Sequence, residues 1–519
     1  MFHLWQTLIR AGLCPDDAAI GEWVTDHDPQ RDLLPSMVRA WQTSSDASDV
    51  STADRCSQRL AILRERQDSG GQLTWNIPGT ASGTAATWLG NRLAWWPRGV
   101  LAGRRVGLVS SRLGRRLDRQ KAWFAALRTA CIRLDPTRDI LLTSEAITSQ
   151  RFVQRCGQLF GVPVLCLEIE RESERALQRW SQRILASEAP SSSSQHRVYL
   201  SPSVAAGESQ QMSDEQVTTP ARDRAMIALS ELLIALHIRP NGNVHRLLES
   251  RLARPDYPPA SVFLALGDGL VPRKIAEPLM DLGAVGWYIM DGDSSADQDI
   301  PPPWMQATSR TTPAAPIIDC PSTEDWPYLT HCTRRREGPW PDQDENAYLD
   351  DLLLDRCGAD HSALAALWRI LRNRRLLASN ELVRGDEAVV SLTAVPLREI
   401  HQLRTFRSHL ARWDFEPYGI CIRRDWLQQQ GARPVHYGGD SLWDQLPVDE
   451  RPFFQRRQSQ TAGGAVMDWT VEREWRLRGD LRLDEIPSDA AIVFVPTRVE
   501  ARQLAAGSPW PVAVLDQRS

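Results

Sequence analysis

Short apolar runs alternate with helix-like stretches between residues 104 and 293, and this alternation limits the folds open to the chain more than any other feature. The runs RRVGLVSSR (104–112), DILLTSE (139–145) and VPVLCLEIE (162–170) each have the length and apolar character of a buried strand. Parallel neighbours in a sheet need a crossover of about a dozen residues or more, which is usually a helix. The sequence therefore predicts an α/β fold with a parallel sheet covered by helices on both faces.

The sequence pattern is different on either side of this region. The spacing of Phe2, Trp5 and Ile9 indicates an amphipathic helix near the start. A stretch dense in Pro, Ser and Thr, DSSADQDIPPPWMQATSRTTPAAP (293–316), is typical of a linker, and mixed helix and strand patterns follow it. We expect a helical N-terminal region (1–99), a parallel α/β domain (100–295), a Pro/Ser-rich linker (296–319) and a separate α+β C-terminal domain (320–519).

Composition excludes several classes of protein. The 519 residues carry 61 basic and 65 acidic side chains, and a formal net charge of −4 argues against a general nucleic-acid coat protein, although not against a local basic patch. No apolar run approaches the roughly 18 residues of a membrane span, and the first residues lack the pattern of a signal peptide. We expect a cytoplasmic protein with no membrane partner. The nine cysteines form no C-x-x-C pair, so no metal site is expected.

The first candidate site lies where the predicted parallel strands end. These ends carry Ser110-Ser111-Arg112, Thr143-Ser144 and Gly267. In open α/β sheets, ligands bind beyond the carboxyl ends of the strands, where small residues let an anion approach the backbone and hydroxyls and Arg donate hydrogen bonds to it. The alternative interpretation is that the small residues only make tight turns.

Two motifs in this region resemble those of the DNA-processing protein A family. The strand end 106–112 is similar to that family's Gly-Ser-Arg, with Ser110 in place of Gly, and Arg222-Asp223-Arg224 is similar to its Arg-Asn-Arg helix start. The run LLIALHIRPNGNVHRLLESRL matches the strand and glycine loop that follow. The resemblance covers about 100–295 and implies a SLOG-type Rossmann-like fold that binds a nucleotide-derived small molecule, with Arg222, Asn241, Gly242 and Asn243 among the binding residues. The Pro-Gly-Gly-x-Gly-Thr loop of the LOG branch is absent, so ligand binding is expected rather than nucleotide hydrolysis.

The second candidate site lies in the C-terminal region. A strand through Tyr328–Arg334 would place His331 and Thr333 on one face, and a strand through Thr470–Arg476 would place Glu472, Glu474 and Arg476 on one face. Such carboxylates can polarise a sugar hydroxyl, or they can form a salt-bridged surface ladder. The mixed run 412–420 can line a cleft, or it can contain a buried Arg–Asp pair that holds a loop.

The C-terminal region is similar to modules of bacterial abortive-infection proteins. The resemblance rests on Tyr418-Gly419-Ile420, on Gly431-Ala432-Arg433-Pro434-Val435-His436-Tyr437 and on Glu472–Arg476. The His-x-Thr start and the late glutamates also resemble the layout of NAD-consuming ADP-ribosyltransferases. That second resemblance implies that His331 and Thr333 hold the NAD ribose and that Glu474 or Glu472 is the catalytic carboxylate.

These observations favour a ligand-sensing protein over two alternatives. In the preferred interpretation, the Rossmann-like domain binds a nucleotide-derived ligand and the C-terminal module is an effector in bacterial stress or phage defence. The cofactor expected for such a protein is NAD or a nucleotide second messenger. The first alternative is a recombination mediator that binds single-stranded DNA through a run of arginines: Arg104, Arg105, Arg112, Arg115, Arg116 and Arg119. The second is a pair of scaffolds for protein partners. A homo-oligomer is compatible with all three.

Overall fold

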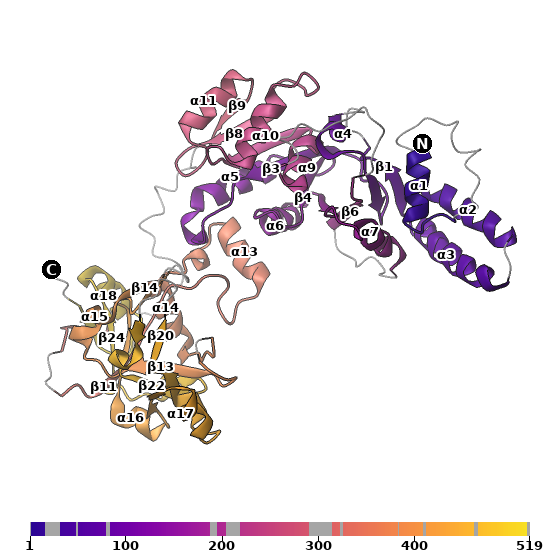
Figure 1. Ribbon diagram of the computed structural model, residues 1–519. Helices are drawn as coiled ribbons and strands as arrows, with labels where there is room; N and C mark the ends of the chain where they lie inside the picture. The colour runs from indigo at the N-terminus through magenta and orange to yellow at the C-terminus, as the bar shows by residue number, and fades with distance from the viewer. Residues whose placement is uncertain are drawn as a thin grey trace. The chain divides into compact units, whose positions relative to one another are not determined.

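The chain divides into two compact units, which are described here one at a time (Figure 1). The computed structural model describes residues 2–15, 32–47, 50–78, 84–186, 195–203, 218–289, 314–321, 325–381, 383–407, 412–460 and 466–515. The first unit contains residues 1–293 and 349–356, and the second contains residues 294–348 and 357–519. The expected linker lies mostly outside the described residues; its last part carries strand β10, Ile317–Asp319.

A nine-stranded sheet forms the first unit, in the order β1-β2-β6-β5-β4-β3-β7-β8-β9. From β6 to β9 every pair of neighbours is parallel, whereas β1 and β2 are antiparallel to their neighbours. The expected α/β fold with a parallel sheet is confirmed. The strands are β1 (Gln72–Trp75), β2 (Leu93–Trp96), β3 (Arg104–Ser110), β4 (Asp139–Ser144), β5 (Val164–Ile169), β6 (Gln195–Leu200), β7 (Leu232–His237), β8 (Val262–Leu266) and β9 (Val285–Tyr288).

Helices cover both faces of this sheet. On β4, Leu142 belongs to the core that contains Met226 of α9, whereas the neighbouring Leu141 approaches Gly157 of α6, so α9 and α6 lie on opposite faces. On the α6 face, Trp123 and Phe124 pack against Phe152. The helices are α4 (Thr84–Leu89), α5 (Lys121–Ile132), α6 (Gln150–Phe160), α7 (Ala176–Leu185), α9 (Ala221–Leu229), α10 (Asn243–Leu252) and α11 (Arg273–Asp281).

The N-terminal helices pack on the β1–β2 end of the sheet. Helices α1 (Phe2–Arg10), α2 (Leu34–Ala47) and α3 (Val50–Asp68) match the helical expectation for this region. Their apolar residues share a core with Leu93 and Trp95 of β2 and with Trp180 of α7. The two strands were not expected: they extend the parallel sheet instead of standing apart from it.

An eight-stranded mixed sheet forms the second unit, in the order β10-β25-β24-β16-β11-β13-β22-β17. Its core lies against α14 (Ala363–Asn373) and α18 (Arg498–Ala505) and includes Leu329, Leu367 and Leu504. Its central strands run antiparallel, which agrees with the expected α+β class. Its strands besides β10 are β11 (Tyr328–Cys332), β13 (Val389–Thr393), β16 (Gly419–Arg423), β17 (Arg433–Pro434), β22 (Glu474–Arg478), β24 (Ala491–Val495) and β25 (Val512–Val514).

Shorter elements complete the chain. The helices are α13 (Glu345–Leu353), α15 (Ile400–Leu403), α16 (Arg424–Gln429) and α17 (Asp440–Gln445). The strand pairs are β12 (Arg375–Leu376) with β23 (Leu481–Arg482), β14 (Thr405–Arg407) with β15 (Arg412–Asp414), β18 (His436–Gly438) with β19 (Phe454–Arg456), and β20 (Gln458–Gln460) with β21 (Val466–Asp468). Among the described residues, no helix is both long enough and apolar enough to cross a lipid bilayer.

Candidate functional site

The order of strands in the first unit reverses between β3 and β7. From β3 the chain proceeds outward through β4, β5 and β6, and it then returns by α9 to add β7, β8 and β9 on the other side of β3. The loop after β3 leads to α5 and the loop after β7 leads to α10, and these helices lie on opposite faces of the sheet. The carboxyl ends of the two neighbouring strands therefore lie between the two loops. Such a reversal is where open α/β sheets bind ligands.

Ser111 ties the two loops of this switch point together. Its backbone N–H donates to the carbonyl of His237 over 2.7 Å, and its hydroxyl accepts from the backbone N–H of Arg239 over 2.9 Å. The Arg239 guanidinium in turn donates to the carbonyl of Arg112 over 2.7 Å. Because these bonds are made mostly by the backbone, they fix the positions of the loops and leave the Arg112 side chain exposed at the surface.

The start of α10 completes this edge. Gly242 is the residue before the helix, no side chain caps the helix there, and a Cβ atom built on Gly242 would lie 4.0 Å from the Ser111 hydroxyl. Asn243 donates from its side chain to Asp223 over 3.1 Å, and Asp223 lies 3.9 Å from Arg222 in an ion pair. The predicted residues Ser111, Arg112, Gly242 and Asn243 are thus brought together, and Arg222 contacts Asp223, the partner of Asn243. Asn241 precedes them in a left-handed conformation, with φ +57°.

Other residues predicted for this site are either bonded within the fold or fully buried. Ser110 donates to the carbonyl of Ser111 over 2.9 Å and accepts from the Trp123 indole over 3.1 Å. Ser144 is buried and donates to the carbonyl of Leu167 over 3.1 Å. Thr143 is fully buried, and its hydroxyl has no hydrogen-bond partner among the described residues.

Gly267, the last residue predicted for the first site, follows β8. Its φ of +153° is one that side-chain-bearing residues rarely adopt, and its carbonyl accepts from Leu270 over 3.2 Å. In the sheet, β7 separates β8 from β3. Gly267 therefore lies at the edge of the sheet where the parallel strands end, but one strand away from the β3–β7 switch point.

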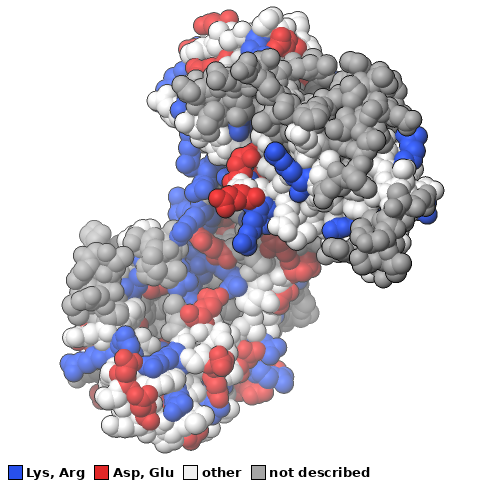
Figure 2. All heavy atoms as spheres, turned by 45° about the vertical axis from the view of Figure 1, so that its right-hand side comes forward, with Lys and Arg blue, Asp and Glu red and all other residues white. Residues whose placement is uncertain are grey.

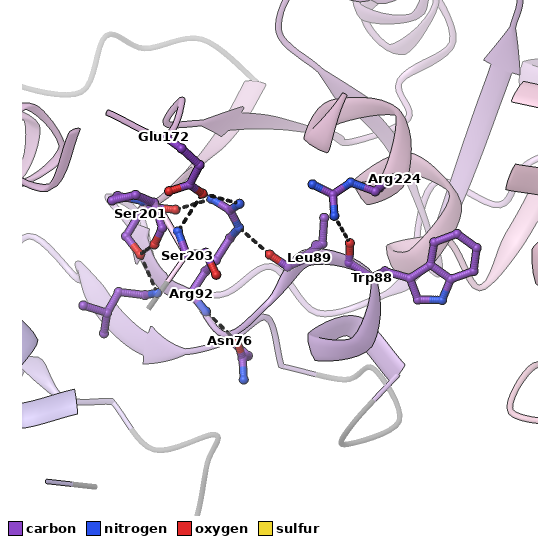
Figure 3. A network of polar contacts seen from close by, with 10 residues as sticks. Asn76, Trp88, Leu89, Arg92, Glu172, Ser201, Ser203 and Arg224 are labelled. Atoms are coloured by element: carbon purple, nitrogen blue, oxygen red, sulfur yellow. Dashed lines mark hydrogen bonds and ion pairs between the residues drawn. The ribbon is translucent and has the colours of Figure 1, made fainter. Parts of the chain in front are cut away.

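Arg224, the second arginine of the Arg-Asp-Arg motif, has a structural role. Its guanidinium donates to the carbonyl of Trp88 over 2.6 Å, which joins α9 to α4 (Figure 3). The same region holds the buried Arg92, which donates to the carbonyl of Ser201 over 2.6 Å and pairs with Glu172 over 2.9 Å. These contacts fasten α4 and the start of β2 to the edge of the parallel sheet.

Most arginines of the run 104–119 already have partners within the protein. Arg104 pairs with Asp139 over 2.8 Å, and Arg105 is buried and donates to the carbonyl of Pro78 over 2.7 Å. Basic and acidic side chains are also interspersed on the face drawn in Figure 2. Arg104 and Arg105 are therefore engaged within the fold and are not free to follow a phosphate backbone.

In the second unit, His331 and Thr333 do not share a strand face. Strand β11 ends at Cys332, and the buried Thr333 hydroxyl donates to the carbonyls of Ala363 over 2.8 Å and of Tyr418 over 3.3 Å. His331 Nδ1 lies 3.0 Å from the carbonyl oxygen of Ser391. Burial, helped by the nearby Arg334 charge, lowers the pKa of His331.

The predicted strand 470–476 is wrong in its first half. Trp469–Glu472 forms a 3₁₀ turn, Arg473 adopts a left-handed conformation with φ +44°, and β22 begins only at Glu474. The wrong half of the prediction follows Asp468. Its side chain accepts a hydrogen bond from the backbone N–H of Thr470 and so caps a turn that the strand-like pattern does not reveal. Glu472 is therefore not on the strand face that carries Glu474.

Glu474 and Glu472 have different surroundings. Glu474 accepts two hydrogen bonds from the guanidinium of the buried Arg476, over 2.9 and 3.1 Å. This agrees with the alternative in which the carboxylate forms a salt bridge. Glu472 lies 3.7 Å from Arg407, and burial together with the neighbouring Glu474 raises its pKa to about 8.

His331 and Glu474 lie on opposite faces of the sheet. Thr393 pairs with both Thr330 and Glu474, so these three residues share one face. His331 is next to Thr330 in β11 and therefore points to the other face.

Sequence reasoning found only part of a group of charged residues around Glu472. Arg407, Arg412 and Asp414 lie on the β14–β15 hairpin, and Arg334 is coupled to Arg412 and Asp414 electrostatically. The mixed run 412–420 was the available signal. Its alternative interpretation, a buried Arg–Asp pair, is closer to what the structure has. No group of three or more His, Cys, Asp or Glu side chains within the described parts of the chain is placed to hold a metal ion.

Comparisons with known proteins give one likeness in structure. No protein-family model matches the chain, and no curated protein matches it at a significant level. Among solved structures, the chain is similar to the X-ray structure of DNA processing protein A (DprA) from Streptococcus pneumoniae, with 13% sequence identity and a TM-score of 0.27. The match covers 55% of this chain and 94% of that chain. A score this low does not establish a common fold, so the α/β assignment rests on the strand order and pairing described above.

Proposed function

We propose that the first unit binds a phosphorylated small molecule of the nucleotide class at the switch point between β3 and β7. The observation that carries the proposal is the double tie made by Ser111, which bonds to His237 and to Arg239 from the two loops. This tie holds the loop after β3 against the loop that starts α10. A phosphate binding there would meet groups that are already in position, which lowers the entropic cost of binding.

The chemistry of this edge suits an anion. The first N–H groups of α10 have no side-chain cap, and a helix start carries a partial positive charge. Arg112 and Arg239 are exposed beside it, and each can offer a planar pair of donors to a phosphate. Gly242 lets a ligand approach the backbone closely because it has no Cβ. Together these groups favour phosphate over a neutral ligand.

A binding experiment on the full-length protein tests this proposal. We expect the wild-type chain to bind a nucleoside triphosphate or dinucleotide in calorimetry, and we expect Arg239→Gln and Arg112→Gln to weaken binding about tenfold each, since each removes a charge-assisted hydrogen bond. Arg254→Gln is the matched control, because Arg254 pairs with Asp256 beyond the opposite end of α10. Equal affinities in all four proteins would rule out this site.

The single-stranded DNA alternative is tested by the same proteins. An oligonucleotide that neutralises many arginines binds with a steep dependence on salt concentration. Since Arg104 and Arg105 are committed within the fold, we expect weak oligonucleotide binding that disappears at moderate salt. Tight binding with a steep salt slope, reduced by Arg112→Gln and by Arg119→Gln, would favour the recombination mediator instead.

The effector role of the second unit, in stress or phage defence, stays a prediction. For an NAD-consuming transferase, Thr333 would have to hold a ribose with a hydroxyl that now donates to Ala363, and Glu474 would have to leave Arg476. Measurement of NAD consumption by the full-length protein, with and without the nucleotide that binds the first unit, tests it. We expect the proposed binding function to stand whichever result is found.

A further inference from the structure

The β14–β15 hairpin of the second unit places two arginines directly opposite each other. In its register, Arg407 pairs with Arg412, and Phe406 pairs with Trp413. Because side chains alternate along a strand, the two aromatic rings lie on one face of the hairpin, and the two guanidinium groups lie on the other, together with Asp414. Like charges at directly opposed positions destabilise a strand pair unless something neutralises them.

The arginine face of the hairpin is buried and incompletely bonded. The side chains of Arg407, Arg412 and Asp414 are 10%, 14% and 17% exposed. Arg407 Nε donates to Asp414 over 2.8 Å, whereas Arg412 Nε lies 3.5 Å from the other carboxylate oxygen, Asp414 Oδ1. As a result, Arg412 Nε and Nη2 and Asp414 Oδ1 are buried without a hydrogen-bond partner among the described residues. Buried polar atoms normally have a partner.

Charge in this cluster is out of balance. A third guanidinium, that of Arg334, adjoins the hairpin: burial, and then the Arg412 charge, lower its pKa. The carboxylate of Asp414 pairs with Arg407 and Arg412, and the charges of Asp414 and Glu381 both act on Arg334. Glu472 lies 3.7 Å from Arg407, but its raised pKa of about 8 keeps it largely protonated at neutral pH, so it neutralises little. A buried guanidinium such as that of Arg412, whose donors are not all hydrogen-bonded, is costly.

We propose that Arg412 and Arg334, supported by Arg407, form a binding site for a phosphate group in the second unit. Nε and Nη2 are the two donors along one edge of the Arg412 guanidinium, and they match two oxygens of one phosphate. Arg334 supplies the second cation that a dianion needs. Arg407 is a positioning residue: it holds Asp414 and thereby the orientation of the hairpin. This site is separate from the switch point in the first unit and requires no catalytic step.

Hydrogen exchange on the full-length protein gives a local test. Inorganic phosphate is the probe, sodium chloride at equal ionic strength is the reference, and peptides that cover 328–336 and 412–423 are followed by mass spectrometry. We expect phosphate to slow exchange in these peptides and Arg412→Gln to weaken that effect about tenfold. Arg482→Gln, at a side chain that is 65% exposed in the same unit, is the matched control and should respond as the wild type does.

Three further measurements separate a binding site from a structural ion pair. In phosphate-free buffer, Arg412→Gln should melt no lower than the wild type, because it removes one of two opposed charges. Arg412→Lys should keep the charge but lose much of the phosphate effect, because an ammonium cannot present the paired donors. Arg239→Gln, in the first unit, should leave the response of these peptides intact. Unchanged exchange in the wild type, an unchanged response in Arg412→Gln, or a lower melting temperature for Arg412→Gln without phosphate would each overturn the proposal.

Discussion

The hydroxyl of Ser111, the residue after β3, accepts a hydrogen bond over 2.9 Å from the backbone N–H of Arg239, which follows β7. One side chain thus joins two loops that lie 128 residues apart in the sequence. Removing that hydroxyl leaves a partly buried N–H without its acceptor. We expect Ser111→Ala to lower the free energy of unfolding by about 1 kcal/mol and to weaken nucleotide binding.

Chemical denaturation and calorimetry check the Ser111 prediction. Ser250→Ala is the matched control, since the Ser250 hydroxyl donates only to a carbonyl within α10. The interpretation of the switch point would be wrong if both variants behaved alike in stability and in binding.

Gly107, in the middle of β3, is required by the close approach of α9. A Cβ atom at this position would lie 2.0 Å from the hydroxyl oxygen of Ser230 and 3.2 Å from Leu233. We expect Gly107→Ala to destabilise the first unit by about 1–3 kcal/mol through overpacking, measured by thermal unfolding. Gly114→Ala is the control, because a Cβ there meets nothing nearer than 3.8 Å. A double variant, Gly107→Ala with Ser230→Gly, should recover part of the loss, and a failure to do so would contradict the packing explanation.

Glu472 makes the stability of the second unit depend on pH. Its pKa is raised from 4.5 to about 8, chiefly by burial and next by Glu474. Between these two pH values the folded protein therefore binds a proton that the unfolded chain has released, and the free energy of unfolding falls as pH rises. We expect Glu472→Gln to remove this fall and to be more stable than the wild type near pH 8, by an amount on the order of 1–3 kcal/mol.

Denaturant unfolding at several pH values between 4.5 and 8 measures the effect of Glu472. Glu485→Gln, whose side chain is 52% exposed, controls for the loss of a carboxylate that water already solvates. Parallel stability profiles for Glu472→Gln and the wild type would show that Glu472 is not buried as a neutral acid.

Glu474 is held by Arg476, and this contact changes how a Glu474 variant should be interpreted. Arg476 is 2% exposed and also donates to the carbonyls of Pro452 and Phe454. We expect Glu474→Gln to lower the free energy of unfolding by about 1–3 kcal/mol, since it leaves a buried cation with weaker partners. Glu387→Gln, which breaks an exposed pair with Arg478, should change it by less than about 1 kcal/mol.

NAD consumption by the same two variants separates catalysis from structure. Loss of turnover in Glu474→Gln at a temperature where the variant is fully folded would support the transferase prediction. Loss that follows unfolding would assign Glu474 a purely structural role.

Local sequence pattern was sufficient to predict the parallel strands but not the details of either site. The apolar runs at 104–110, 139–144 and 164–169 are strands because both faces of the sheet are buried, so every position favours an apolar residue. The bond between Ser111 and Arg239 depends on the order of strands, which no local pattern encodes. Period-two alternation also failed at Glu472, where Asp468 caps a 3₁₀ turn.

The cluster of Arg334, Arg407, Arg412 and Asp414 could not be predicted from the sequence, for a similar reason. Arg407 and Arg412 lie opposite each other because β14 and β15 pair in this register, whereas Arg334 lies just beyond the end of β11. Only the composition of 412–420 pointed to this place. The partners of each charge follow from tertiary packing and could not be assigned in advance.

Strand β2 covers the outer side of β6, and β1 in turn lies outside β2. Without them, the backbone donors and acceptors along one flank of β6 would lack partners, and such a bare flank recruits strands from other molecules. A fragment cut at residue 100 to isolate the Rossmann-like part would therefore be prone to aggregate. Expression trials that aim for this part alone should start ahead of Gln72.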